Sequence, residues 1–348
     1  MANKSLKSTK TGLIIHTAGL GDFIMFTPVV KLLKEKFERI NLYVFTSDRF
    51  SYELIKFYCD EGYIAKVFYV NFVFNKIDLL KFLLSSFLIK PDFILTTTAF
   101  NSIKGELIYL ILGNKKLARL TKDAKLLKNF IRYEFKEKHQ VEQNLIYLER
   151  ALNLRFDHSD AKPFLPSRLT KKIFNGLDSF KILIHPGSSK GGSIRRYPLE
   201  KFIKVAKILR DDGFEVAFIL GPAEKDLSSY ISSEFRVFCV DNLEDCCELI
   251  TNYSFFLNSD SGLGHLAAAL NRYVFTIFGP ANPDLSKPYS PKVIVIRSPF
   301  LPPCSPCIYP PVNKKECEDR ICLTSIDENF VATKIKNFAK EIKNNPNK

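Results

Sequence analysis

The feature that most constrains the fold is the alternation of short apolar runs with longer amphipathic stretches along the whole chain. A short apolar run bounded by turn residues is typical of a strand buried on both faces, and an amphipathic stretch is typical of a helix lying on a sheet. Their regular alternation indicates βα units and parallel sheets. The sequence therefore predicts an α/β protein.

The expected elements divide into two similar halves. In the first half, strands are expected at residues 12–16, 40–45, 64–70 and 92–97, and helices at 21–37, 50–58, 76–88, 102–112 and 140–152. In the second half, strands are expected at 181–185, 215–220, 236–240, 253–258 and 273–278, and helices at 199–211, 243–251, 264–270 and 327–342. Each half contains enough strands for a sheet of its own.

A length of 348 residues favours two domains, because single cores stop growing at about 250–300 residues. The best linker candidate is 157–178, which contains Pro163, Pro166 and Gly176. We expect an N-terminal domain at 1–165, a C-terminal domain at 166–325 and a final helix at 326–348. Two facing domains of this kind bind ligands in a cleft, at the carboxyl ends of their strands.

The first loop of chemical interest follows the strand at 12–16 and contains Gly19, Gly21 and Asp22. Glycines here let the backbone turn tightly and approach a ligand, and they place Asp22 at a helix start. In the simpler interpretation, Asp22 only complements the helix dipole. The spacing differs from the GxGxxG dinucleotide fingerprint, which argues against NAD.

A second loop, at 186–198, follows the strand at 181–185. It contains the hydroxyls of Ser188 and Ser189 and two arginines, Arg195 and Arg196. Backbone N–H groups, hydroxyls and guanidinium groups are what a diphosphate requires, so this loop predicts a phosphate site. The alternative is an ordinary connection, in which glycine and serine are common.

Two further loops are expected at the same edge. After the strand at 253–258, the chain reads Asp260-Ser261-Gly262 and then His265 in the first turn of an alanine-rich helix, whose free N–H groups form an anion site. A helix histidine taken alone is more often structural. In the fourth loop, Glu224 is a candidate acceptor for sugar hydroxyls.

Taken together, these loops resemble glycosyltransferase family 9, the bacterial heptosyltransferases of the lipopolysaccharide inner core. The resemblance rests on GLGDFIMFTP, HPGSS followed by IRRYP, and NSDSGLGHLAAAL followed by FGPANP. It implies a GT-B fold, formed by two facing Rossmann-like domains with a central cleft. It also implies an acceptor in the N-terminal domain and a nucleotide sugar in the C-terminal domain.

The resemblance assigns roles residue by residue. It implies Asp22 as the catalytic base, and Tyr197 stands where tryptophan is commoner in the family. The residues implied for the nucleotide sugar, together with those predicted from the loops, are Ser188, Ser189, Arg195, Glu224, Asp260, Ser261, Gly262 and His265. Those assigned to the acceptor are His16, Gly19, Gly21, Lys122 and Lys125. His16 departs from the family, which usually has arginine or lysine there.

An inverting transfer needs a base for the acceptor hydroxyl and groups that neutralise the departing diphosphate. Asp22 would be the base, while Arg195, Ser188, Ser189 and the helix start near Gly262 would stabilise the phosphates. Since the chain contains no Asp-x-Asp element, this interpretation requires no cofactor for catalysis.

The net charge of +14 is unevenly distributed. Residues 1–175 hold 29 Lys and Arg against 17 Asp and Glu, a net +12, and residues 115–138 alone hold nine Lys and Arg. Such a field suits nucleic acid, an anionic membrane or a phosphorylated substrate, or is simply a solvated face. Nucleic-acid motifs are missing from the sequence, so an anionic glycolipid acceptor at a membrane is the better prediction.

The chain is expected to be cytoplasmic, on the inner face of the bacterial inner membrane. Its first ten residues lack an apolar signal region, and its apolar runs are too short to span a bilayer. The run at 79–89 is either an ordinary core helix or an interfacial segment. In the second case, Phe82, Leu83, Leu84, Phe87 and Leu88 would contact the membrane.

Four of the eight cysteines form a C-x2-C-x9-C-x4-C cluster at 304–322, namely Cys304, Cys307, Cys317 and Cys322. Disulfides are rare in the cytoplasm, and four thiolates suit a tetrahedral site. The cluster predicts a structural Zn or Fe, with free thiols as the alternative. Family members with similar clusters imply a small metal-bound knuckle.

The leading hypothesis is transfer of heptose from ADP-heptose to an inner-core acceptor. Another nucleotide sugar, or a protein or capsule acceptor, is the alternative within the family. A sugar-nucleotide epimerase on the same scaffold and a nucleic-acid-binding module are alternatives from other classes.

Overall fold

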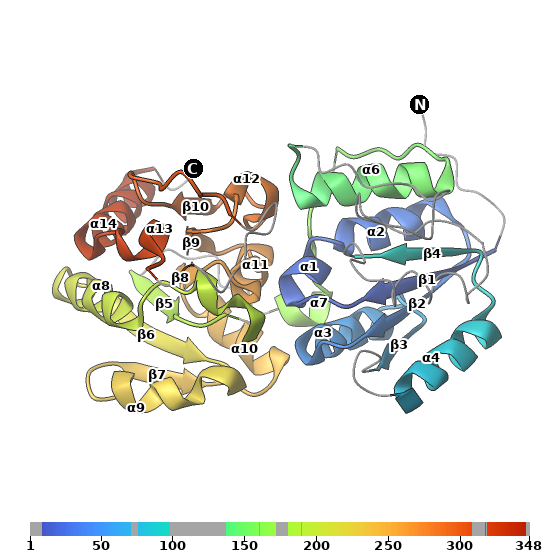
Figure 1. Cartoon of the computed structure of the whole chain (residues 1–348), viewed down its shortest axis with the longest axis horizontal. Coiled ribbons are helices and arrows are strands. Elements are labelled where there is room, and N and C mark those ends of the chain that lie inside the picture. Colours follow the sequence, from blue (N-terminus) through green and yellow to red (C-terminus); the bar gives the residue numbers. More distant parts are fainter. Residues whose placement is uncertain are drawn as a thin grey trace. The chain divides into compact units, whose positions relative to one another are not determined.

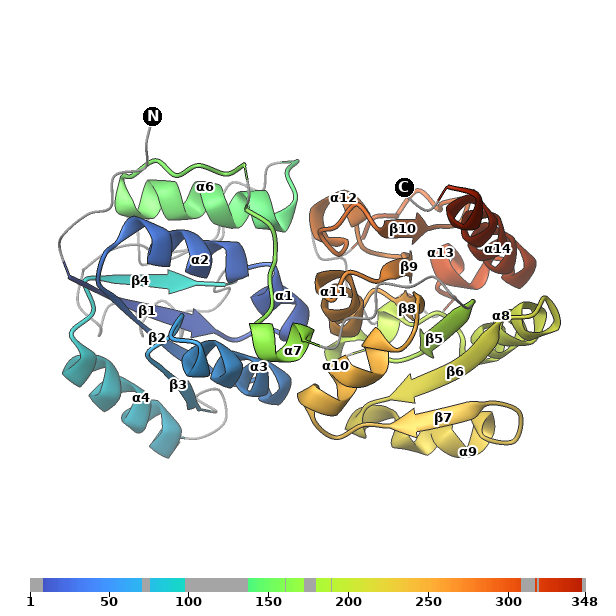
Figure 2. The ribbon, with the colours of Figure 1, turned by 180° about the vertical axis from the view of Figure 1, so that it is seen from behind.

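The computed structural model describes residues 9–70, 76–97, 137–159, 161–171, 180–188, 190–307, 317 and 319–345. The chain divides into two compact units, Met1–Arg168 and Leu169–Lys348. Each unit is an α/β layered structure with its own parallel sheet, as predicted (Figures 1 and 2). The expected helix at 102–112 lies outside the described residues.

The first unit contains a sheet with strand order β3-β2-β1-β4, in which all described pairings are parallel. Its strands are β1 (Lys10–His16), β2 (Ile40–Thr46), β3 (Lys66–Tyr69) and β4 (Phe93–Thr96). Its helices are α1 (Leu20–Ile24), α2 (Thr27–Lys36), α3 (Arg49–Asp60), α4 (Lys76–Ile89) and α6 (Gln140–Leu152), and α7 (Ser167–Thr170) lies at the division between the units.

The helix expected at 21–37 is two helices, α1 and α2, with a break at Met25 and Phe26. The reason is Pro28, which has no N–H to donate to the carbonyl of Ile24 four residues earlier. Instead, the Thr27 hydroxyl donates to the Ile24 carbonyl at 2.8 Å. The break ends α1 as a short helix that contains Asp22.

One face of the first sheet is covered by α4. Phe82 of α4 is buried, and it lies in one apolar cluster with Leu13, Ile15 and Phe45 of the strands. The rings of Phe45 and Phe82 meet edge to face, 4.7 Å apart. An aromatic pair of this geometry adds about 0.5–1.5 kcal/mol to the free energy of burial, so this contact fixes α4 on the sheet.

The second unit has a six-stranded parallel sheet of order β10-β9-β8-β5-β6-β7. Its strands are β5 (Lys181–His185), β6 (Glu215–Leu220), β7 (Arg236–Cys239), β8 (Phe255–Ser259), β9 (Tyr273–Ile277) and β10 (Val293–Ile296). Its α-helices are α8 (Leu199–Asp211), α9 (Ser228–Ile231), α10 (Leu243–Thr251), α11 (Gly262–Ala269), α12 (Pro283–Ser286), α13 (Ile321–Thr324) and α14 (Glu328–Asn344), and its 3-10 helices are η1 (Lys190–Arg195) and η2 (Pro222–Leu227). Strand β10 was not predicted.

Among the residues that the structure describes, none of the helices combines the length and apolar character that a bilayer-spanning segment needs.

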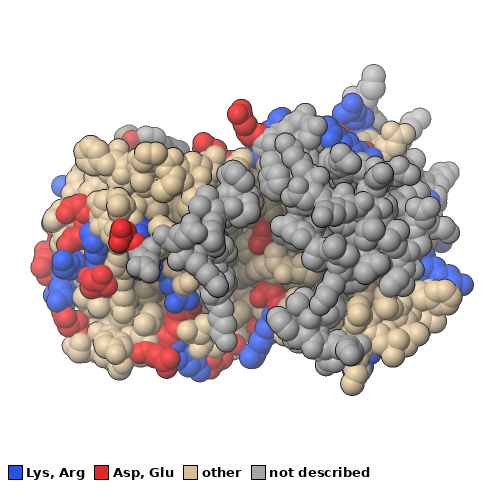
Figure 3. Space-filling view, in the orientation of Figure 1, with Lys and Arg blue, Asp and Glu red and all other residues tan. Residues whose placement is uncertain are grey.

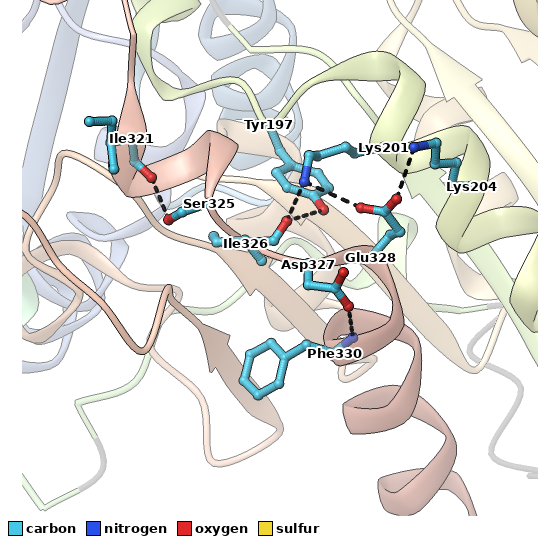
Figure 4. Close-up of polar contacts among 9 residues, drawn as sticks. All are labelled: Tyr197, Lys201, Lys204, Ile321, Ser325, Ile326, Asp327, Glu328 and Phe330. Carbon is cyan, nitrogen blue, oxygen red and sulfur yellow. Dashed lines mark hydrogen bonds and ion pairs between the residues drawn. The ribbon is translucent and has the colours of Figure 1, made fainter.

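The C-terminal helix α14 is fixed to the core by polar contacts at its start (Figure 4). Asp327 caps the helix by accepting from the Phe330 N–H, and Glu328 pairs with Lys201 at 3.2 Å and Lys204 at 3.0 Å. Lys201 and the Tyr197 hydroxyl both donate to the Ile326 carbonyl. These contacts join α14 to α8 and to the end of the loop at 186–198.

The pKa of Glu328 is lowered to about 2, chiefly by the hydrogen bond from Lys204. Because this pKa lies below the ordinary value of 4.5, the stabilisation is complete above pH 4.5 and is lost as pH falls toward 2. We expect Glu328→Gln to lower the free energy of unfolding by about 1 kcal/mol at pH 7. The difference from wild type should shrink at pH 3 in urea titrations.

The matched control is Glu234→Gln, which removes the exposed Lys207–Glu234 pair and should change the unfolding free energy by less. An equal difference between Glu328→Gln and wild type at pH 7 and pH 3 would contradict the assignment.

Candidate functional site

The candidate site of the second unit lies at the carboxyl edge of β5, β6 and β8. Strand β5 pairs with β6 on one side and with β8 on the other, and His185 at its end is level with Asn258 of β8. The strand order reverses at β5, and open α/β sheets bind ligands at such a reversal. Three of the loops predicted to carry chemistry follow these three strands.

Arg196 organises the loop after β5. Its Nε donates to the Ser188 hydroxyl at 3.0 Å, and its Nη2 donates to the Ser188 carbonyl at 2.7 Å. The same nitrogen lies 3.5 Å from Oε1 of Glu224, which belongs to η2 after β6. Arg196 therefore joins the loops after β5 and β6. Arg196 is conspicuous in the sequence, but it was not among the residues predicted for the site.

Glu224 is buried against the loop after β5. A Cβ added at Gly187 would lie 2.5 Å from Cδ of Glu224, so in this arrangement the carboxylate fills the space that a side chain at position 187 would need. Burial raises the pKa of Glu224, while Arg196 and the backbone N–H groups of Gly221 and Ser188 act in the opposite direction. The structure thus places two predicted residues, Ser188 and Glu224, side by side.

Asp260 and Arg195 form the second predicted group. Nη1 of Arg195 lies 3.2 Å from Oδ2 of Asp260, whose side chain is almost completely buried. Asp260 comes directly after β8, and Arg195 ends η1. A buried carboxylate beside a half-buried guanidinium holds that cation at the carboxyl edge of the sheet.

The start of α11 follows Asp260 in the sequence. Ser261 occupies its N-cap position without a side-chain cap, Gly262 begins the helix and His265 is buried in the first turn. The Ser261 hydroxyl instead contacts Nδ1 of His185 at 3.3 Å and accepts from Asn258 at 3.2 Å. The first N–H groups of α11 therefore receive no bond from the Ser261 side chain.

His185 and Asn258 are supporting residues that were not predicted from the sequence. Burial, with a smaller effect from Arg196, lowers the pKa of His185 to about 3, so the ring is neutral at physiological pH. Asn258 also accepts from the Thr276 hydroxyl at 3.0 Å, and a Cβ at Gly264 would overlap its Nδ2. Both are polar residues at the end of an otherwise apolar strand, and this pattern could have indicated them from the sequence.

In the first unit, Asp22 lies in the first turn of α1 and is half-buried. Its Oδ1 accepts from Nε2 of Gln140 at 3.1 Å. Asn144, one turn later on α6, donates to the Met25 carbonyl at 3.0 Å. Helix α6 therefore holds both the Asp22 side chain and the backbone of its loop. Gly19 caps α1, and Gly21 is buried within it.

His16 is completely buried, and both of its ring nitrogens have partners. Nδ1 lies 2.7 Å from the Thr97 hydroxyl and Nε2 lies 2.9 Å from the Ser51 hydroxyl. Burial lowers its pKa to about 3, so the ring is neutral. This geometry gives His16 an internal role, joining β1 to α3 and the end of β4, and its contact with an acceptor stays a prediction.

All four cysteines of the cluster, Cys304, Cys307, Cys317 and Cys322, are among the described residues. The pKa of Cys322 is raised to about 11, chiefly by burial and then by the neighbouring thiols of Cys307, Cys317 and Cys304. The four sulfurs are thus close enough to interact electrostatically. Among the described residues, no three His, Cys, Asp or Glu side chains form a ready-made metal site.

Three further residues predicted for the site, Ser189, Lys122 and Lys125, lie outside the described residues.

A comparison with models of known protein families shows which family the chain belongs to. The model of glycosyltransferase family 9 (heptosyltransferase) matches residues 92–315. The chain belongs to this family. The match contains the loops after β5, β6 and β8, and it confirms the resemblance inferred from the sequence.

Individual relatives agree with this assignment. Lipooligosaccharide heptosyltransferase 2 of Haemophilus influenzae is 33% identical over 121 residues, which cover 32% of this chain and 35% of the relative. The corresponding Campylobacter jejuni protein is 28% identical over 225 residues, covering 61% of this chain and 67% of the relative. The chain spans about a third of the length of the first of these curated relatives.

Solved structures show the same fold. Heptosyltransferase II of Escherichia coli superimposes with a TM-score of 0.68 at 19% identity, covering 96% of this chain and 99% of that chain. A family 9 glycosyltransferase of Veillonella parvula gives 0.72 at 16% identity, covering 97% and 100%. The fold class predicted from the sequence, α/β of the GT-B type, is therefore confirmed.

The packing of Glu224 against Gly187 can be tested by substitution. We expect Gly187→Ala to lower the free energy of unfolding by about 1–3 kcal/mol, because the added methyl group overlaps the buried carboxylate. Gly19→Ala is the matched control, since a Cβ there meets nothing within 4 Å, and it should cost less than about 0.5 kcal/mol. Equal urea midpoints for the two variants would contradict this packing.

Proposed function

We propose that the chain is an inverting glycosyltransferase that moves heptose from ADP-heptose to an acceptor of the lipopolysaccharide inner core or a related surface glycan. The observation that carries the proposal is the grouping of Ser188, Arg195, Arg196, Glu224 and Asp260 at one sheet edge, in a chain of the heptosyltransferase family. In support, an E. coli relative of the same fold is described with ADP-2-deoxy-2-fluoro heptose.

The proposed donor site uses two kinds of groups. Arg195, the Ser188 hydroxyl and the start of α11 provide positive charge and hydrogen-bond donors for the diphosphate. Glu224 provides an acceptor for sugar hydroxyls, and Arg196 favours its ionised form despite its burial. The two groups are adjacent, because Arg196 bonds Ser188 and Glu224 at once.

In the proposed reaction, an acceptor hydroxyl oxygen attacks the anomeric carbon of the donor. The bond from that carbon to the diphosphate oxygen breaks, and ADP leaves with the electron pair. Asp22 takes the hydroxyl proton, and the amide of Gln140 orients its carboxylate. Arg195 and the N–H groups of α11 stabilise the charge that develops on the leaving phosphate.

We expect Asp22→Asn to lower the transfer rate by about 10²–10⁴-fold, because the amide cannot accept the proton. ADP affinity, measured by calorimetry, should stay within about twofold of wild type. Asp157→Asn, which changes an exposed aspartate of the same unit, is the control for transfer. If turnover survives in Asp22→Asn, then Asp22 is not the base.

The donor assignment is tested with purified protein, ADP-heptose and inner-core acceptors. Release of ADP together with a heptosylated product is the expected result, and the absence of both with every acceptor overturns the assignment. Product analysis without an acceptor separates a transferase from an epimerase, since an epimerase needs none.

We further propose that the reaction takes place on the cytoplasmic face of the bacterial inner membrane, where the acceptor is an anionic glycolipid. The net +12 of residues 1–175 supports this location, since the excess positive charge belongs to the half assigned to the acceptor.

We also propose a structural Zn or Fe ion at the cysteine cluster. The donor set fits in kind, because four mutually interacting thiols provide the sulfur ligands that tetrahedral sites use. The ion would fix the segment that contains Cys304 and Cys307 against Cys322, which is buried beside Gly279. A glycosyltransferase from enterotoxigenic E. coli that superimposes with a TM-score of 0.60 is described as iron-containing.

Metal content tests this proposal directly. We expect about one Zn or Fe per chain by elemental analysis, and close to none in Cys304→Ser/Cys307→Ser. Cys239→Ser removes an exposed thiol elsewhere in the second unit and should keep the metal. Wild-type protein that binds neither metal after reduction and supplementation would show that these thiols are free.

A further inference from the structure

Helix α4 exposes an apolar face. Five large side chains are more than half exposed, in the order Ile77, Leu80, Leu84, Phe87 and Leu88, with Phe87 75% and Leu88 78% exposed. Their spacing of three, four, three and one residues places them on one side of the helix. Isolated exposed hydrophobic residues are common, but a continuous face of this kind indicates an interaction site.

The opposite face of α4 packs against the core. Phe82 is buried, and Leu79, Leu83 and Ile89 pack against the cluster that contains Leu13 and Phe45. The expected interfacial face, which included Phe82 and Leu83, is therefore wrong in those two residues. The exposed face is not needed to attach α4 to the sheet, so its apolar character is unexplained by folding.

The charges on α4 identify the partner. Lys81 borders the exposed face, with its side chain 69% exposed, and Lys90 follows the helix and is also exposed. The single acid of α4, Asp78, is only 23% exposed and lies 3.9 Å from Lys81. The face therefore presents apolar groups and positive charge together. Figure 3 shows tan and blue atoms where Figure 1 places α4.

We propose that this face of α4 is a docking surface for an anionic phospholipid bilayer. The five apolar side chains enter the boundary between headgroups and acyl chains, and Lys81 and Lys90 contact lipid phosphates. Lys81 at the border of the apolar side chains and Lys90 after the helix are placed as in interfacial helices, which bury apolar side chains while lysines reach the lipid phosphates. The inference rests on the proposed function in one respect: membrane docking would give the enzyme access to a glycolipid acceptor.

Vesicle flotation tests the docking surface without any donor or acceptor. The wild-type chain should bind vesicles of phosphatidylcholine and phosphatidylglycerol, and Phe87→Ser/Leu88→Ser should bind about tenfold or more weakly. Tyr230→Ser, which changes an isolated tyrosine that is 71% exposed on α9, is the matched control and should bind like wild type. Lys81→Gln/Lys90→Gln should lose the preference for anionic over neutral vesicles.

Three results overturn the inference: wild-type protein that ignores anionic vesicles, equal binding by Phe87→Ser/Leu88→Ser, or a dimer that this double variant dissociates in sedimentation. Failure of the proposed function is a separate result. If no heptose is transferred even to a lipid-free acceptor, while vesicle binding still depends on α4, then the results support the docking surface and contradict the proposed reaction.

Discussion

The candidate donor site depends on the parallel pairing of β5 with both β6 and β8. Parallel strands in register end at one edge, so their following loops meet regardless of their separation in sequence. His185, Leu220 and Ser259 end these strands, and the loops behind them contain Ser188, Glu224 and Asp260. A slip of one residue in either pairing would turn alternate side chains to the other face and separate these groups.

At that edge, two buried carboxylates are balanced by two guanidinium groups. Asp260 pairs with Arg195, and Glu224 pairs with Arg196. Since removing a carboxylate from water is costly, each guanidinium group offsets part of that cost and holds a hydrogen-bond acceptor in a partly dry place. The cationic and anionic groups alternate there, which suits a ligand that has both phosphates and hydroxyls.

The inner strands, such as β1, β5 and β8, were predictable because burial on both faces makes each of them an apolar run. The edge strand β10 is only partly buried and was not predicted. The break between α1 and α2 could have been predicted from Pro28, although the apolar periodicity continues across it. Arg196 was harder to identify, because two adjacent arginines look equivalent in sequence and only the loop geometry assigns one to Asp260 and the other to Glu224. The partners of His16 are equally invisible in the sequence, since Ser51 and Thr97 lie 35 and 81 residues away.

The contact of Gln140 with Asp22 has a consequence for synthesis on the ribosome. The two residues are separated by 118 positions, and Asn144 adds a second bond from the same helix to the same loop. Strands β1 and β2 leave the ribosome early, but the carboxylate of Asp22 is not oriented by Gln140 until α6 has emerged and docked. In a nascent chain, the geometry around Asp22 is therefore completed only after Asn144 has been synthesised.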